Sequence, residues 1–249
     1  MEGVRGEQTQ YVQPVSDTGQ LSSRGMLASD LRDLGVVGGD VLMAHASLRA
    51  VGPMLDGPDT LIAAMLEATA PGGTVLAYTD WEAPYRHAWR NGPPPLEMRN
   101  AIAAFDPVRS RAARDNGALA EFLRTWPEAR RSRNPGASVA AIGARADWLT
   151  ADHPLDYGYG EGSPFARLIE CGGKVLMIGA PLETMTLLHH AEHLADLVNK
   201  RVVRFEVPLA TSGNIDWRTI EEYNTAMPVV AGFRWIFTLK RGGPRRRSS

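Results

Sequence analysis

This sequence contains almost no cysteine: Cys171 is its only one among 249 residues, so no disulfide bond can form within the chain. A chain without disulfides is typical of the reducing cytoplasm. No apolar run reaches the length that a bilayer requires, and the N-terminus has no signal-peptide core. The net charge of −1 gives no indication of a nucleic-acid partner. We therefore expect a cytoplasmic protein that binds neither membranes nor nucleic acid.

The sequence also lacks several widespread catalytic motifs. It has no G-x-x-x-x-G-K-[ST] or G-x-G-x-x-G phosphate-binding loop, and no G-x-S-x-G turn that would expose a nucleophilic serine. These absences disfavour P-loop, Rossmann and serine-hydrolase chemistry. Because no activated Ser or Cys stands in a suitable motif, a covalent acyl-enzyme is not expected.

What is present is the composition of a globular protein, with 44% hydrophobic and 22% charged residues. Apolar runs of strand length alternate with segments of helical periodicity, which favours parallel crossovers. The pattern predicts helices at 24–34, 59–69, 117–125, 144–149, 164–170 and 186–197, and strands at 40–44, 74–78, 139–142, 174–181, 202–209 and 215–220. The last two strands are expected to form a hairpin added to the sheet edge. The fold class is therefore a single α/β domain with a central mixed sheet flanked by helices.

The ends of the chain differ in composition from its middle. Residues 1–20 are polar and predict a loose arm, residues 21–240 the domain, and residues 241–249 a basic tail. Residues 81–104 are rich in Trp, Pro, Arg and Asn, which indicates an insertion that forms a lid or a substrate wall.

The predicted helix at 186–197 carries the residues with the most evident chemistry. It follows a buried strand, where open α/β folds usually bind ligands. His189 and Glu192 are three residues apart and share a face of the helix. A carboxylate beside an imidazole orients the ring and raises its basicity, as a general base near neutral pH requires. His189 and Glu192 are therefore the candidate catalytic residues.

The same letters allow a metal site. His189, Glu192 and His193 fit H-x-x-E-H, in which two histidines bind zinc and the glutamate activates water. Such a site needs a third protein ligand, for which the downstream candidates are Glu206, Glu221 and Glu222. A zinc hydrolase is thus one alternative, and metal analysis separates it from a metal-free enzyme.

Six short stretches of the chain carry a recognisable pattern. They are 42–52 (LMAHASLRAVG), 105–107 (FDP), 131–135 (RSRNP), 162–164 (GSP), 173–179 (GKVLMIG) and 186–192 (TLLHHAE). Together they resemble the aminoglycoside 3-N-acetyltransferases, a family of antibiotic-acetylating enzymes with a fold distinct from the GNAT acetyltransferases. Each stretch alone is a weak match, but all six occur in the family's order over about residues 24–225.

The resemblance implies acetyl-CoA-dependent acetylation of the 3-amino group of 2-deoxystreptamine aminoglycosides, which confers antibiotic resistance. It implies that His189 is the general base and that Glu192 orients it or helps to bind the cationic sugar. The residues implied to line the acetyl-CoA site, where backbone N–H groups would stabilise the thioester oxyanion, are His45, Ser47, Leu48, Arg131, Ser132 and Asn134. The acids expected to attract a polycationic antibiotic are Asp80, Glu82, Asp106 and Glu121. The resemblance implies no metal, and we expect a monomer or a homodimer.

Two features depart from the family's pattern. Asn224 stands where an Asp that contacts substrate or the catalytic histidine is expected, and Glu221 or Glu222 would compensate. We keep Glu222 and Asn224 as candidate substrate-binding residues. Residues 233–240 and the Arg-rich tail match none of the elements expected there. A second alternative is therefore a relative that binds CoA or aminoglycosides with impaired activity.

Overall fold

The computed structural model describes residues 21–83, 94–197, 200–211, 213–224 and 236–238. None of the helices in these ranges combines the length and the hydrophobicity that crossing a bilayer requires. In chain order the elements are α1 (Arg24–Asp33), β1 (Val41–Ala46), α2 (Leu48–Val51), α3 (Pro58–Thr69), β2 (Thr74–Tyr78), α5 (Leu96–Arg99), η1 (Arg114–Asn116), α6 (Ala118–Arg124), β3 (Arg130–Arg131), β4 (Val139–Gly143), α7 (Ala146–Thr150), α8 (Pro164–Glu170), β5 (Lys174–Ile178), η2 (Leu182–Thr184), α9 (Leu187–Leu194), β6 (Arg201–Thr211), β7 (Asn214–Asn224) and β8 (Ile236–Thr238).

The centre of the molecule is a six-stranded sheet in the order β3-β4-β2-β1-β5-β8. β1 pairs in parallel with both β2 and β5, and β8 lies parallel to β5. β4 runs antiparallel to β2 and β3. The sheet is therefore mixed, and the parallel crossover from β1 through α3 to β2 confirms the sequence prediction.

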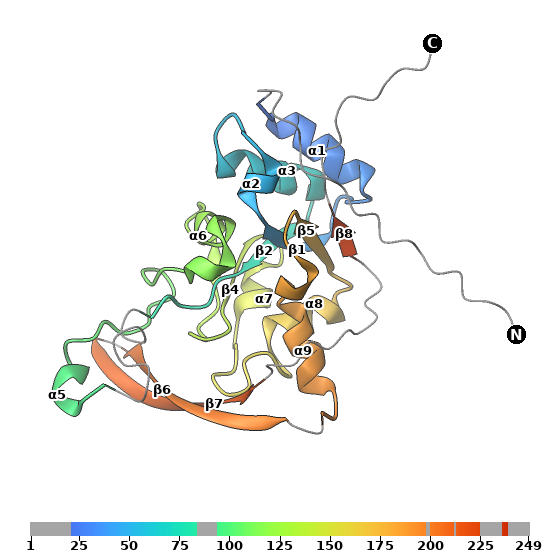
Figure 1. Ribbon diagram of the computed structural model, residues 1–249. Coiled ribbons are helices and arrows are strands. Elements are labelled where there is room, and N and C mark those ends of the chain that lie inside the picture. The colour runs from blue at the N-terminus through green and yellow to red at the C-terminus, as the bar shows by residue number, and fades with distance from the viewer. Residues whose placement is uncertain (1–20, 84–93, 198–199, 212, 225–235, 239–249) are drawn as a thin grey trace, which may run out of the picture.

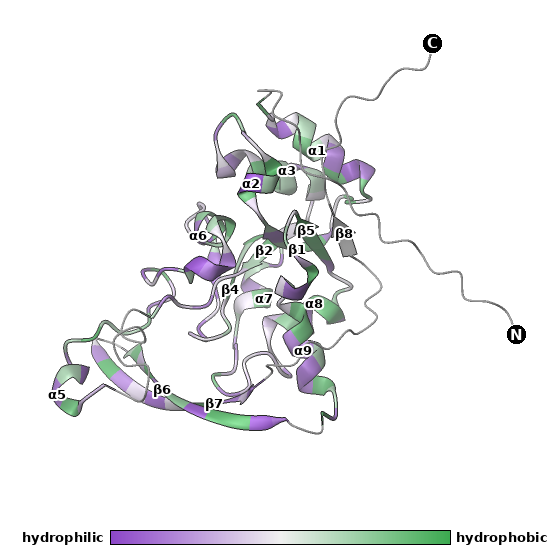
Figure 2. Cartoon of the chain, in the orientation of Figure 1, coloured by the Kyte–Doolittle hydropathy of each residue, from purple (hydrophilic) through white to green (hydrophobic). Residues whose placement is uncertain are grey.

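Helices cover the sheet on both faces (Figure 1). Leu27 of α1, Leu61 of α3 and Leu123 of α6 belong to the core of one face, where they pack with β1, β2 and β5. Phe165 of α8 and Leu187 of α9 belong to the core of the other face. The central strands are correspondingly hydrophobic over most of their length, with His45 in β1 and Lys174 in β5 as polar exceptions (Figure 2). These two cores confirm the prediction of a sheet flanked by helices.

The chain leaves the central strands toward opposite faces of the sheet. After β1 it enters α2 and α3 on one face, whereas after β5 it enters η2 and α9 on the other (Figure 1). Such a reversal opens a crevice at the carboxyl ends of the parallel strands, where α/β proteins bind ligands. The fold therefore directs the search for a site to residues just after β1 and β5.

The hairpin prediction was right about the strands and wrong about their place. β6 and β7 pair in antiparallel register from Arg201↔Asn224 to Thr211↔Asn214, but they form a separate two-stranded sheet. This hairpin curves below the main body, with α5 near one end and α9 near the other (Figure 1). It is joined to the body through Phe105, whose backbone N–H and C=O bond to Pro208 and Ala210. The edge beside β5 is taken instead by β8.

Several boundaries differ from the predictions, and two of them concern the candidate site. β1 continues through His45 to Ala46, so His45 projects from a strand and not from the loop after it. The helix α9 ends at Leu194, before the predicted 197, because Ala195 is extended. The Lys200 side chain donates hydrogen bonds to the C=O groups of His193 and Ala195, which have no partner within the helix. The predicted arm, the predicted tail and residues 84–93 of the predicted lid lie outside the described residues.

Candidate active site

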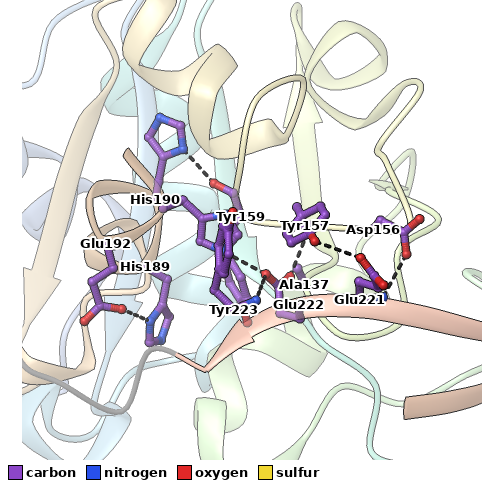
Figure 3. A network of polar contacts seen from close by, with 12 residues as sticks. Ala137, Asp156, Tyr157, Tyr159, His189, His190, Glu192, Glu221, Glu222 and Tyr223 are labelled. Atoms are coloured by element: carbon purple, nitrogen blue, oxygen red, sulfur yellow. Dashed lines mark hydrogen bonds and ion pairs between the residues drawn. The ribbon is translucent and has the colours of Figure 1, made fainter. Parts of the chain in front are cut away.

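The helix α9 brings His189 and Glu192 together as the spacing predicts. Nδ1 of His189 lies 2.9 Å from Oε2 of Glu192, and the two side chains come from successive turns (Figure 3). The Glu192 side chain is 4% exposed, whereas that of His189 is 40% exposed. Because a carboxylate only accepts hydrogen bonds, we assign the ring proton to Nδ1, and Nε2 then carries the lone pair. The pair is arranged as a base with an orienting carboxylate.

His189 faces a cavity of about 430 Å³ at the carboxyl ends of β1, β2 and β5. Its lining combines the end of β1, the segment after β5 and the segment before α6: Ala44, His45, Ala46, Ser47, Ala77, Tyr78, Asp115, Asn116, Gly117, Leu119, Ala120, Ala180, Pro181, Glu183, Thr184, Thr186 and His189. The cavity thus occupies the crevice that the reversal of the chain creates.

His45 is a second imidazole of this cavity. Its Nε2 is buried and has no hydrogen-bond partner among the described residues. Burial lowers the pKa of His45 from 6.5 to about 4, so the ring is neutral near pH 7. A neutral ring keeps one N–H donor, and a buried polar atom without a partner is costly unless a ligand or water meets it.

Ser47 and Leu48, which were also predicted to line the acetyl-CoA site, lie in different surroundings. Ser47 lines the cavity and begins α2, and its backbone N–H donates to the C=O of Ile178. Leu48 packs against the core of the α1–α3 face instead. The loop after β1 therefore contributes Ser47 to the cavity and uses Leu48 as an anchor.

A larger cavity, of about 770 Å³, adjoins the first at Gly117 and contains three of the predicted acids. Glu82, Asp106 and Glu121 line it together with Arg109, Arg111 and Arg114, so its charge is mixed. Burial raises the pKa of Glu121, but hydrogen bonds from Arg124 and from the Ala112 N–H outweigh it and leave the pKa below its ordinary value.

Asp80 lines neither of the two cavities, but it bonds to a lining residue of each. Its carboxylate accepts a hydrogen bond of 2.5 Å from Nδ2 of Asn116, a lining residue of the smaller cavity, and its C=O accepts from the Ala113 N–H. Asp80 therefore orders the 113–116 segment that separates the two cavities.

Arg131, Ser132 and Asn134, predicted to line the acetyl-CoA site, have side chains turned inward. Arg131 donates to Ser138 Oγ and to the C=O groups of Thr79 and Ser110, and burial lowers its pKa to about 10. Ser132 is 0% exposed and accepts from the Val139 N–H. These three side chains line neither of the two cavities, so their contact with acetyl-CoA stays a prediction.

Asn134 shapes the loop in which it stands. Its Oδ1 accepts from the N–H groups of Gly136 and Ala137, and its Nδ2 donates to the C=O groups of Pro154 and Leu155. All its hydrogen-bonding capacity is used inside the protein. Asn134 therefore joins residues 136–137 to residues 154–155.

A second histidine–glutamate pair, which the sequence did not predict, lies one turn after the first. Nε2 of His193 is 2.7 Å from Oε1 of Glu222 in β7, which is within ion-pair distance. The orientation of the ring does not meet the geometry of a hydrogen bond. Oε2 of Glu222 accepts from the Gly158 N–H. Both carboxylate oxygens of Glu222 thus contact the protein and the residue lines neither of the two cavities, so its place at the substrate stays a prediction. Asn224 is exposed at the end of β7 and also lines neither.

The arrangement does not favour the zinc alternative. Within the described ranges no group of three or more His, Cys, Asp or Glu residues is placed to hold a metal ion. His193, one of the two histidines of H-x-x-E-H, is paired with Glu222 instead. The carboxylate of Glu192 is turned to the ring of His189.

A third buried histidine connects the loops beneath α9 and makes stability depend on pH. His153 Nδ1 is 2.8 Å from Ser132 Oγ, and its Nε2 is 2.7 Å from the C=O of Gly158. Burial lowers the pKa of His153 from 6.5 to about 4. Between these values the unfolded chain binds a proton that the folded chain does not, so stability is complete above about pH 6.5 and is lost as the pH falls toward 4.

We expect the free energy of unfolding to fall between pH 7 and pH 5 by about 2 kcal/mol for His153 alone. Urea unfolding at both pH values measures this fall. In His153→Gln the fall should be smaller by that amount, since glutamine does not titrate. An equal pH dependence in the wild type and the variant would show that folding leaves the pKa of His153 unchanged.

Comparison with known proteins places this chain in a family. A profile described as aminoglycoside 3-N-acetyltransferase matches residues 43–234. The chain is 44% identical over 211 residues to an aminoglycoside N(3)-acetyltransferase III of Pseudomonas aeruginosa, which covers 81% of this chain and 75% of that protein.

Solved structures agree. The structure of AAC-IIIb binary with CoASH has a TM-score of 0.81 and 59% identity, covering 86% of this chain and 81% of that one. AAC-VIa bound to sisomicin has a TM-score of 0.77 and 42% identity, covering 83% and 77%. The chain belongs to the aminoglycoside 3-N-acetyltransferase family.

Proposed function

We propose that this protein catalyses acetyl-CoA-dependent N-acetylation of the 3-amino group of 2-deoxystreptamine aminoglycosides, with His189 as the general base. The observation that carries the proposal is the His189–Glu192 pair at the edge of the 430 Å³ cavity. Relatives with this fold are described as aminoglycoside N(3)-acetyltransferases, and one is bound to CoASH and another to sisomicin. The reaction confers resistance, because acetylation removes a positive charge from the antibiotic.

The chemistry is a direct transfer between two bound substrates. The amine nitrogen attacks the carbonyl carbon of the acetyl thioester, so that a C–N bond forms and the C–S bond breaks. Nε2 of His189 takes the proton from the attacking amine, and the imidazolium then protonates the leaving thiolate. Glu192 holds Nδ1–H and stabilises the positive ring between these two proton transfers.

The acetyl group would lie in the smaller cavity, between His189 and the end of β1. His45 and Ser47 line that space. The neutral ring of His45 offers an N–H to the carbonyl oxygen of the thioester, where negative charge develops in the transition state. The buried Nε2 without a partner supports this role.

The aminoglycoside would approach through the larger cavity. Glu82, Asp106 and Glu121 offer it carboxylates, and Asp80 bonds to Asn116 of the smaller cavity. Because arginines line the same space, these acids would select a polycation by contacts at close range and not by a net negative field. One chain provides all these residues, so we propose that a monomer or each subunit of a homodimer is active, in the cytoplasm.

The test is thiol release from acetyl-CoA by the purified protein with gentamicin-, tobramycin- and neomycin-like aminoglycosides. We expect release that depends on the aminoglycoside, with acetylation at the 3-amino group in the product by NMR. Absence of release with every antibiotic, together with absence of acetyl-CoA binding by calorimetry, would overturn the proposal.

Replacing His45 with phenylalanine should lower kcat by about 10- to 100-fold. Phenylalanine keeps the ring in its buried place, but it removes the donor proposed to meet the thioester oxygen. Steady-state kinetics measure the loss, and an acetyl-CoA dissociation constant within about threefold of the wild type would separate a transition-state effect from weaker binding. A kcat equal to that of the wild type would show that the thioester oxygen has another donor.

A further inference from the structure

We propose that Glu222 and His193 position the catalytic helix: the pair ties the β6–β7 hairpin to α9 and thereby sets the orientation of His189. The inference rests on the proposed function of His189 as the base. It gives Glu222 a different role from substrate binding, because its carboxylate is directed at the protein itself (Figure 3).

Glu222 holds three parts of the chain together. Its Oε1 lies 2.7 Å from Nε2 of His193 in α9, and its Oε2 accepts a 2.8 Å hydrogen bond from the N–H of Gly158. The side chain of Glu222 is 14% exposed and that of His193 is 3% exposed, so this contact is largely shielded from water. β7, α9 and the loop that contains Gly158 are therefore joined at one carboxylate.

The loop of Tyr157, Gly158, Tyr159 and Gly160 transmits this arrangement to His189. The ring of Tyr159 packs against both histidines, with centroids 5.0 Å from His189 and 5.9 Å from His193. The C=O of Tyr159 accepts a 2.6 Å hydrogen bond from Nδ1 of His190 (Figure 3). A shift of this loop therefore changes the surface on which the His189 ring rests.

The loop has little room to adjust independently of its neighbours. A Cβ at residue 158 would lie 2.9 Å from the Cβ of Ala137, and one at residue 160 would lie 3.1 Å from Nδ1 of His193. The hydroxyl of Tyr159 is 2.5 Å from that of Tyr78 on β2. The loop is therefore a rigid link between the sheet, α9 and the hairpin.

The hairpin meets α9 at a second place beside the pair. Lys200, directly before β6, donates to the C=O of His193 and lies 4.1 Å from the centroid of the Tyr223 ring. Tyr223 in turn packs against His193 with centroids 4.9 Å apart. Charge and packing thus converge on His193, one helical turn after the catalytic base.

The experiment compares Glu222→Gln, His193→Phe and the double variant with the wild type. Each substitution preserves most of the volume and removes one member of the pair. We expect kcat to fall by about 10- to 100-fold in either single variant, because a small misplacement of a catalytic group has effects of that order. The KM for the aminoglycoside should stay within about twofold, and the double variant should be no slower than the slower single one.

Glu206→Gln is the matched control. Glu206 lies in the same hairpin and pairs with Arg99 at 2.6 Å, away from α9, so its neutralisation should leave kcat unchanged. A rise in KM with kcat preserved in Glu222→Gln would overturn the proposal in favour of substrate binding. A lower melting temperature with the kcat of the wild type would show that the pair only stabilises the fold. Additive losses of kcat in the double variant would show that the two residues act separately.

One readout does not need turnover. In protein labelled with ¹⁵N-histidine, the His189 ring signals, identified by their loss in His189→Ala, should move in Glu222→Gln and His193→Phe but stay in place in Glu206→Gln. Unmoved signals in both pair variants would overturn the proposal. If the wild type releases no thiol with any aminoglycoside while these signals still move, the proposed function fails and the positioning remains.

Discussion

His189→Ala should abolish aminoglycoside-dependent acetyl transfer, with kcat lower by about 10²- to 10⁴-fold. The expected loss is large because the attacking amine has to give up a proton as its bond to the acetyl carbon forms. In the structure the His189 side chain lines a cavity, is 40% exposed and has the carboxylate of Glu192 at its Nδ1. Thiol release under saturating substrates measures kcat, and calorimetry measures whether acetyl-CoA still binds.

We expect acetyl-CoA to bind His189→Ala as it binds the wild type. The ring is 40% exposed and its removal opens no buried cavity, so the melting temperature should change little. His190→Gln is the neighbouring control: His190 is buried beneath the helix and bonds to the backbone of Tyr159, so its replacement tests for damage to the helix itself. A kcat of His189→Ala within about threefold of the wild type would exclude His189 as the base.

The contact between His189 and Glu192, the proposed catalytic pair, was predictable because its geometry is local. Residues three apart on a helix are neighbours whatever the tertiary fold, and the observed 2.9 Å contact between His189 and Glu192 follows from that spacing. The strands of the sheet were predictable for the same reason, since a buried run bounded by Gly and Pro needs no knowledge of its partners. Local periodicity therefore accounts for most of the fold and for the base.

The second pair was not predictable, because it joins residues 193 and 222 from different elements. No periodicity relates them, and the pairing depends on where the hairpin lies against α9. Alternation identifies β6 and β7 as strands but does not say which edge they join, which is why the hairpin was wrongly expected on the central sheet. For the same reason the sequence did not indicate that Glu222 contacts His193 and Gly158.

A motif likewise does not separate the residues that meet a ligand from those that shape the loop around it. His45 and Ser47 reach the cavity, whereas Ser132 and Asn134 are buried in hydrogen bonds to the backbone. For Tyr159 the sequence offers no functional signal beyond its place between Gly158 and Gly160. Its contacts with His189 depend on tight packing at Gly158 and Gly160, which only the folded structure reveals.

Glu192→Gln should lower kcat by about 10- to 10³-fold while the protein stays folded. Glutamine has nearly the same shape, but it removes the negative charge that stabilises the imidazolium. Its amide can also donate to Nδ1, and a ring that accepts at Nδ1 carries its proton on Nε2, where it cannot act as a base. Steady-state kinetics give the loss, and ¹⁵N spectra of His189 give the share of each tautomer. Asp196→Asn, an exposed acid just beyond α9, is the control with the same loss of charge.

The double variant His189→Ala/Glu192→Gln decides between the two roles considered for Glu192. If Glu192 acts only through the ring of His189, removing it from a protein that already lacks the ring should cost no further activity. If Glu192 instead helps to bind the cationic sugar, the KM for the aminoglycoside should rise in both backgrounds. The geometry favours the first result, because Glu192 is buried and its carboxylate faces Nδ1 of His189. Equal residual rates in the single His189 variant and the double variant would therefore establish the two residues as one catalytic unit.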